Sequence, residues 1–141
     1  MLYRTTLSAP VFGLRREIDR LFEDTFGRGD AMSSWTPAVD VYETADSYIV
    51  TAEVPGMNRS DIDLTVEDWR LTIRGHRTDR DTARGVTHFH QVERGHGAFA
   101  RSFEFAEQID PGAVSADLTD GVLTIRLPKV PAPPPRRIEV K

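Results

Sequence analysis

The sequence predicts an all-β fold, a two-layer antiparallel β-sandwich that lies between an N-terminal arm and a C-terminal tail. From Pro37 onward, short runs of strand-forming residues follow one another, and turn-forming residues separate them. No helical pattern lies between these runs, so we expect neighbouring strands to pair antiparallel. Asp120-Gly121 divides the last two runs, and this pair tolerates the positive φ angles of a two-residue hairpin turn. The expected boundaries are residues 1–36 for the arm, 37–129 for the sandwich and 130–141 for the tail.

The first expected element is an amphipathic helix in the arm. Apolar residues from Leu14 to Phe26 recur at spacings that place them on one helical stripe, and Gly27 ends the helix. A helix packed on its own domain is one interpretation. A loop rich in Gly, Ser and Asp follows it, however, and this favours an arm that is free or docked on a partner. The apolar residues of this arm that we single out as candidates for such contact are Phe12, Leu14, Ile18, Leu21, Phe22 and Phe26.

The strands of the sandwich are rich in β-branched and aromatic residues. The first runs are Val39 to Tyr42, Tyr48 to Val54, Ile62 to Val66 and Trp69 to Ile73. Pro55-Gly56, a turn near Asp68 and Gly75 end them. The later runs are Thr87 to Glu93, Phe99 to Phe105 and the two strands of the hairpin, the last of which ends at Pro128. About seven short strands of this kind indicate an immunoglobulin-like sandwich.

One of these strands carries a charge on an apolar face. Odd-numbered residues share a face of the run Phe99 to Phe105, so Arg101 points the same way as three phenylalanines. A buried guanidinium without a partner is very costly. Arg101 therefore either meets a carboxylate or a subunit boundary, or lies on an edge strand from which it reaches water. We favour the paired, interfacial position.

Composition and charge exclude several classes of protein. The 141 residues suffice for one domain of roughly 90–100 residues with flanking arms. A net charge of −4 argues against a nucleic-acid-binding protein, which normally has a basic face. No apolar run approaches the roughly 20 residues of a membrane span, and we recognise no secretory signal. Because the chain has no cysteine, it has no disulfide framework, and a cytoplasmic location fits best.

Candidate chemistry is confined to the histidines and one glycine-rich segment. His88 and His90 share a face of their predicted strand and lie near His76 and His96 in the sequence, so a zinc site is conceivable. Histidines that face solvent or an interface are the favoured interpretation, because no convincing further ligands are spaced around them; they would make assembly sensitive to pH. Residues 95–100 resemble a dinucleotide fingerprint, but a strand follows them where a helix is needed. We therefore expect no enzyme, no metal and no cofactor.

The tail ends on an apolar-polar-apolar triplet, Ile138-Glu139-Val140. An isolated tail cannot bury such a triplet on itself, so the triplet indicates docking on another surface. Four prolines between residues 131 and 135 favour an extended spacer of roughly 3 Å per residue, which lets the triplet reach a neighbour. This arrangement favours an assembling protein over a catalyst.

Five segments in this order resemble motifs of the small heat-shock proteins, whose core is the α-crystallin domain. The most specific is Ala116 to Leu123, which fits the family's Ala-x-x-x-x-Gly-Val-Leu pattern. The other four segments are Tyr48 to Gly56, Leu71 to Gly75, Gly97 to Phe103 and Ile138 to Val140. The resemblance covers about residues 37–130 and includes recognisable arms on both sides.

The resemblance implies an ATP-independent holdase, which keeps partly unfolded client proteins soluble for ATP-dependent chaperones. It implies a dimer in which the strand Thr87 to Glu93 pairs with the partner's strand near Val39. It also implies a larger homo-oligomer in which the tail docks between two strands of a neighbour. The implied dimer-interface residues are Val39, Val41, His88, His90, Val92 and Arg101. The implied tail anchors are Ile138 and Val140, and the implied groove residues are Ile62, Leu64, Val66, Val114 and Leu118.

We expect the apolar stripe of the arm to supply most of the contact with clients, because assembly conceals it and subunit release exposes it. Two other classes of protein are worth comparing. A β-sandwich co-chaperone adaptor without holdase activity would lack the Ile-x-Val tail and the insertion between Gly75 and Gly97. A metal-dependent enzyme would need a ligand set that this sequence does not offer.

Overall fold

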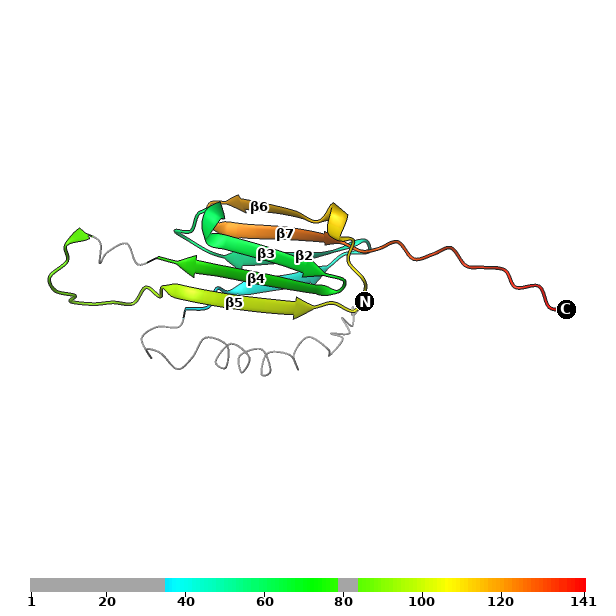
Figure 1. Ribbon diagram of the computed structural model, residues 1–141, viewed down its shortest axis with the longest axis horizontal. Helices are drawn as coiled ribbons and strands as arrows, with labels where there is room; N and C mark the ends of the chain where they lie inside the picture. Colours follow the sequence, from blue (N-terminus) through cyan, green and yellow to red (C-terminus); the bar gives the residue numbers. More distant parts are fainter. Residues whose placement is uncertain (1–34, 79–83) are drawn as a thin grey trace, which may run out of the picture.

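A computed structural model of the protein describes residues 35–78 and 84–141 (Figure 1). In this part of the chain, seven strands form two antiparallel sheets that pack against each other as a β-sandwich. The predicted fold class is confirmed. The helix expected within residues 14–26 lies outside the described residues, and so do the candidate client-binding residues Phe12, Leu14, Ile18, Leu21, Phe22 and Phe26.

The first sheet has the strand order β1-β2-β7-β6, so β2 and β7 are central and β1 and β6 are edges. Its strands are β1 (Val39–Glu43), β2 (Ser47–Glu53), β6 (Ser115–Thr119) and β7 (Val122–Pro128). The register places Val50 of β2 beside Ile125 of β7. Both residues are fully buried, because alternation along each strand turns every second side chain toward the other sheet.

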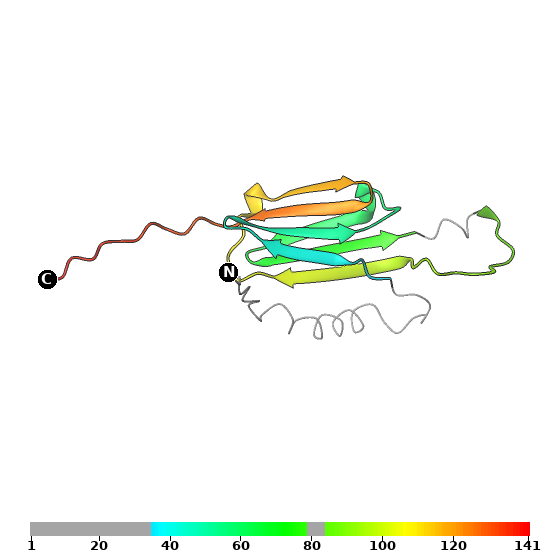
Figure 2. The same cartoon turned by 180° about the vertical axis from the view of Figure 1, so that it is seen from behind.

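The second sheet has the strand order β3-β4-β5, with β4 in the centre. Its strands are β3 (Ile62–Glu67), β4 (Arg70–Arg77) and β5 (Gly97–Glu104). Short 3-10 turns precede two of the strands: η1 (Arg59–Asp61) leads into β3, and η3 (Pro111–Ala113) leads into β6 of the first sheet. The chain therefore passes from one sheet to the other after β2 and returns after β5 (Figures 1 and 2).

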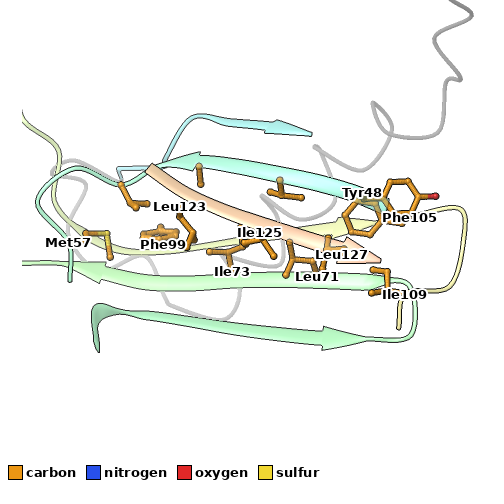
Figure 3. Close-up of a cluster of buried hydrophobic side chains, with 13 residues drawn as sticks. Tyr48, Met57, Leu71, Ile73, Phe99, Phe105, Ile109, Leu123, Ile125 and Leu127 are labelled. Atoms are coloured by element: carbon orange, nitrogen blue, oxygen red, sulfur yellow. The ribbon is translucent and has the colours of Figure 1, made fainter. Parts of the chain in front are cut away.

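The hydrophobic core lies between the inner faces of the two sheets (Figure 3). Leu71 and Ile73 of β4 meet Leu123, Ile125 and Leu127 of β7 there, and all five side chains are almost completely buried. Each fully buried aliphatic side chain contributes roughly 1.5–3 kcal/mol of transfer free energy. At one end of the core, the rings of Tyr48 and Phe105 lie 4.5 Å apart, so this end of the sandwich is closed by aromatic packing.

The hairpin between β6 and β7 has the turn that its sequence predicts. Asp120 and Gly121 have φ angles of 52° and 77°, which a two-residue hairpin turn of type I′ requires. The turn also contacts the segment that follows β2, since the amide of Val54 donates to the carbonyl oxygen of Gly121 at 2.7 Å. A Cβ atom at position 121 would lie 3.1 Å from Cα of Pro55, so close packing adds a second reason for glycine.

Two predicted strand assignments are wrong for the single chain. Residues 87–93 form no strand, because no neighbouring strand in the same chain offers them a ladder, and their side chains are exposed. Gly75 does not end its run, since β4 continues to Arg77. The ring of Phe99 packs across this glycine, and a Cβ atom at position 75 would lie only 2.7 Å from that ring. Gly75 thus serves close packing inside a strand.

Candidate functional site

The candidate site is a set of surfaces that a second chain can cover: four sheet edges, an exposed loop and an exposed tail. Among the described residues, β1 and β6 pair on one side only, and so do β3 and β5 of the other sheet. An edge strand of this kind offers a row of backbone donors and acceptors to another strand. The fold therefore leaves several places where self-association can extend a sheet.

The tail extends away from the sandwich after Val130 (Figures 1 and 2). Its two candidate anchors are nearly completely exposed: 84% for Ile138 and 97% for Val140. No other described aliphatic side chain of this size is so exposed. The structure thus places both predicted anchors where a neighbouring molecule can reach them.

The root of the tail, in contrast, is held firmly by the sandwich. The amide of Lys129 donates to the carbonyl oxygen of Asp46, and the amide of Val130 donates to that of Gln108, each at 2.8 Å. These two bonds attach the chain to the β1–β2 turn and to the loop after β5. The tail therefore leaves from a fixed point and in a fixed starting direction.

The side chain of Lys129 reinforces this root. Its Nζ donates to carboxylate oxygens of Glu43 and Glu107, the latter at 3.0 Å, and it lies 4.9 Å from the centre of the Tyr48 ring. The hydrogen bond to Glu43, together with that to Glu107, raises the pKa of Lys129 above its ordinary value. We call Lys129, Glu43 and Glu107 the lysine clamp. Sequence reasoning missed it, because its members are far apart in the chain and carry no local pattern.

The predicted groove residues lie on two different sheet edges. Ile62, Leu64 and Val66 follow one another on the inner face of β3. Val114 and Leu118 lie just before and within β6, the edge of the opposite sheet. All five are partly buried and pack against the core. Each edge thus combines partly open aliphatic side chains with unpaired backbone, which suits an incoming extended segment.

The predicted dimer-interface residues fall into two groups. Val39 and Val41 lie on the inner face of the edge strand β1, opposite Ala52 and Val50 of β2. His88, His90 and Val92 belong to the loop before β5, where their side chains are exposed. This loop projects beyond the end of the sandwich (Figure 1). Within one chain the structure does not bring the two groups together.

Arg101 lies on the inner face of β5 and reaches the beginning of the first sheet. Its Nη1 donates to the carbonyl oxygen of Pro37 at 3.1 Å, and its guanidinium carbon lies 5.4 Å from the centre of the Phe103 ring. The side chain is half-buried. The backbone carbonyl of Pro37 therefore provides one hydrogen-bond acceptor for the Arg101 guanidinium, which lies on the same face as the phenylalanines of β5.

The base of the exposed loop is fixed by an aromatic contact that sequence reasoning also missed. The guanidinium carbon of Arg77 lies 4.0 Å from the centre of the Trp35 ring, and its Nε donates to the carbonyl oxygen of Gly95 at 2.7 Å. Trp35 in turn packs edge-on against Phe99, with ring centres 5.1 Å apart. Desolvation by this packing lowers the pKa of Arg77, and nearby Arg94 lowers it further. We call Trp35, Arg77 and Gly95 the loop base.

The described residues contain neither a cluster of metal-ligating side chains nor a membrane-spanning helix. Within residues 35–78 and 84–141, no three His, Cys, Asp or Glu side chains gather as a metal site would require. In the same part of the chain, no helix is both long and apolar enough to cross a bilayer. The described edges, loop and tail offer surfaces for association.

Comparisons with known proteins place this arrangement in a wider group. The profile of the Hsp20/alpha crystallin family matches residues 40–141. "Spore protein SP21" of Stigmatella aurantiaca is 37% identical over 115 residues, which cover 82% of this chain and 68% of that protein. "Small heat shock protein C2" of Rickettsia felis is 31% identical over 134 residues, which cover 90% of this chain and 86% of that protein.

A solved structure is also similar. It is described as a small heat-shock protein from Xylella fastidiosa with "a distinct high order structure", and its sequence is 33% identical to this chain. The TM-score is 0.66, and the match covers 77% of this chain and 99% of that one. The similarity extends over the sandwich as a whole and does not depend on one motif.

Proposed function

Because the chain belongs to the Hsp20/alpha crystallin family, we propose that it is an ATP-independent holdase that prevents partly unfolded proteins from aggregating. The observation that carries this proposal is the exposed pair Ile138 and Val140 at the end of a tail with a fixed root. Covering one aliphatic side chain contributes roughly 1.5–3 kcal/mol. A two-anchor contact is therefore strong enough to assemble subunits and weak enough for heat to release them.

Self-association would use the surfaces described above. The tail of one subunit docks its anchors against the partly open aliphatic side chains of β3 and β6 on a neighbour. The loop that carries His88 and Val92 pairs with the β1 edge of a partner, where Val39 and Val41 lie. In the single chain this loop is exposed and pairs with no strand. This supports the proposed pairing with a partner, because an extended segment gains backbone hydrogen bonds when it joins a sheet edge.

Clients would bind to apolar surface that assembly conceals. The arm residues between Phe12 and Phe26 form such a stripe in the sequence. Within the described residues, Phe89 and Val92 add exposed apolar area near the proposed dimer contact, with 55% and 60% of their surface accessible. Release of subunits on heating would uncover these side chains when unfolded proteins accumulate.

The chain would act in the cytoplasm and pass its clients to ATP-dependent chaperones for refolding. The lack of cysteine in the sequence supports a reducing compartment. The holdase itself needs no nucleotide, because capture and release depend only on the exposure and covering of apolar surface.

Light scattering of a heat-labile client tests the proposal directly. The purified full chain, without ATP, is expected to suppress scattering at about one subunit per client molecule. An equal mass of serum albumin serves as the control for nonspecific crowding. If the chain protects no better than albumin against several unrelated clients, it is a β-sandwich adaptor without holdase activity and the proposal is wrong.

A further inference from the structure

The edge strands that would receive the tail carry charge of one sign only. Residues 60–69, which contain β3, and residues 110–125, which contain β6, include no Lys or Arg. The same two segments hold seven carboxylates: Asp61, Asp63, Glu67, Asp68, Asp110, Asp117 and Asp120. Most of these side chains are exposed. Exposed edges usually carry charges, often lysine, that discourage other strands from adding to them. Here every charge on both edges is negative.

The tail carries the opposite charge. Residues 131–141 contain three basic residues and one acidic residue: Arg136, Arg137 and Lys141, and Glu139. The whole chain, in contrast, has a net charge of −4. Two of these positive charges stand directly before the Ile138 anchor. The basic residues of an otherwise acidic chain thus lie next to the proposed anchors Ile138 and Val140.

We propose that the acidic edges of β3 and β6 select the Arg136-Arg137 end of a second copy's tail and fix its register. The proposal rests on the proposed docking of the tail and adds its source of specificity. The edges repel each other when two copies approach edge to edge, because both are negative. They attract the tail of another copy, so the same charges suppress sheet-to-sheet addition and admit the intended segment.

Strand geometry brings the opposite charges together. In an extended tail, Ile138 and Val140 share one face, while Arg137 points to the other. On β3, Leu64 points inward and Asp63 points outward. A tail that lays its anchors against the inner aliphatic side chains therefore turns Arg137 toward the outer side, where Asp63 or, on β6, Asp117 lies.

Not every edge carboxylate is equally available. Asp61 accepts the amide of Asn58 at 2.7 Å, and Asp110 accepts that of Gly112 at 3.0 Å, so both already have local roles. Asp117 accepts the hydroxyl of Thr119. Asp63 stands opposite Arg74 in the ladder between β3 and β4. Asp63 and Asp117 are exposed, lie within β3 and β6, and each stand next to a partly buried leucine, Leu64 or Leu118, so they are the best probes of the proposal.

The test is a set of charge exchanges in the full chain. Oligomer mass is measured by light scattering after chromatography across a dilution series, at 50 and 500 mM NaCl. We expect R136E/R137E to raise the concentration at half-dissociation at least about fivefold at low salt, and D63K/D117K to act similarly. Combining the two pairs should restore most of the loss, and E139K should tighten assembly. All differences should shrink at high salt, because salt screens exposed charges.

Matched controls separate a specific contact from net charge. E53K makes the same charge change as D63K or D117K alone, on the exposed face of β2 away from both receiving edges. Circular dichroism and thermal unfolding verify that each variant folds. The proposal is overturned if R136E/R137E assembles like the parent at 50 mM NaCl, if E53K acts as strongly as D63K and D117K, or if the exchanged pairs give no rescue.

I138A/V140A, measured in the same series, distinguishes the two proposals. If this variant dissociates but the charge variants do not, only the electrostatic selection fails. If it assembles like the parent, the docking of the tail fails, and the selection fails with it. A tail that folds back on its own chain would give variant effects that do not depend on protein concentration, which also overturns selection of a second copy.

Discussion

Gly75 illustrates how a single residue sets the packing of one sheet. It lies inside β4 with an ordinary backbone conformation, so its value is its size. The ring of Phe99 and the carbonyl oxygen of Asp61 would lie 2.7 and 2.9 Å from a Cβ atom at this position. Neither group can move freely, because the ring is buried in the core and the carbonyl belongs to the backbone of η1.

We therefore expect G75A to destabilise the protein by about 1–3 kcal/mol through overpacking. Thermal unfolding at fixed protein concentration measures the change. G112A is the matched control, since a Cβ atom there would lie 3.4 Å from Oδ1 of Asp110, an ordinary contact. Equal unfolding temperatures for the two variants would contradict this account of Gly75.

Tryptophan fluorescence can test the role of a second residue, Arg77, in covering the Trp35 ring. It covers the Trp35 ring and holds the carbonyl oxygen of Gly95, so it fixes the loop base. In a W69F background, which removes the other tryptophan, we expect R77M to shift the emission of Trp35 to longer wavelength as water reaches the ring. R74M, on the outer face of the same strand, is the control. An unchanged spectrum for R77M would mean that Trp35 is held by Phe99 alone.

At the scale of elements, the lysine clamp joins three connections that are distant in the sequence. It links the β1–β2 turn, the loop after β5 and the root of the tail. Because the Glu43 hydrogen bond raises the pKa of Lys129, the clamp's stabilisation is complete below the ordinary lysine pKa of 10.5. On the alkaline side it is lost as the pH rises above that value, through the raised pKa of the folded protein.

We expect K129M to release the root of the tail without unfolding the sandwich. The protection factor of the Val130 amide against hydrogen exchange should fall about tenfold, because that amide relies on the same junction. The ratio between K129M and the parent should stay constant from pH 6 to pH 9. K141M, which removes a lysine from the free end of the tail, is the control, and a similar loss of protection there would argue against the clamp.

The same scale shows which elements can be predicted from sequence and which cannot. The Asp120-Gly121 hairpin and the alternating strand β3 follow from local backbone and side-chain preferences, and both were predicted correctly. The predicted strand at residues 87–93 is wrong for one chain, because a strand needs a ladder and β-propensity does not supply one. The sequence predicts a strand end at Gly75 and is wrong there, because a glycine required by a distant ring looks like any other glycine in the sequence.

The candidate site divides along similar lines. The tail anchors and the aliphatic side chains of β3 could be proposed from the sequence, because they follow a terminal or periodic pattern. The lysine clamp and the loop base went unnoticed because Lys129 and Glu43, or Trp35 and Gly95, meet only through the topology of the sandwich. Arg101 was identified as anomalous from strand alternation, but its bond to the carbonyl oxygen of Pro37 depends on where β1 begins.

At the scale of the whole molecule, the proposed tail anchors would govern how many copies assemble. We expect I138A/V140A to leave the sandwich folded and to reduce the oligomer to small units, because each alanine removes most of the apolar area that a neighbour would cover. Native mass spectrometry measures the change. E139Q, which alters the residue between the anchors without removing apolar area, is the control and should keep the parent's high mass.

Deletion of residues 1–34 tests the role of the arm in the whole molecule. The described residues begin at Trp35, and the core cluster among them is formed by side chains between Trp35 and Leu127. We expect the truncated chain to fold but to suppress the scattering of a heated client several-fold less than the full chain, since the arm's apolar stripe is gone. Undiminished protection would assign client binding to the sandwich or its loop.

Because Lys129 and Val130 are hydrogen-bonded to the sandwich, the tail starts from a fixed position on it. The two anchors lie eight and ten residues beyond Val130, so at about 3.1 Å per residue they can reach a shell of about 25–31 Å radius around it when the tail is extended. Any receiving edge within that shell experiences a high effective concentration of anchors, whatever the angle between the two sandwiches. If the tail docks as proposed, the same contact can join copies at more than one angle, and one copy can replace another without any change in the contact.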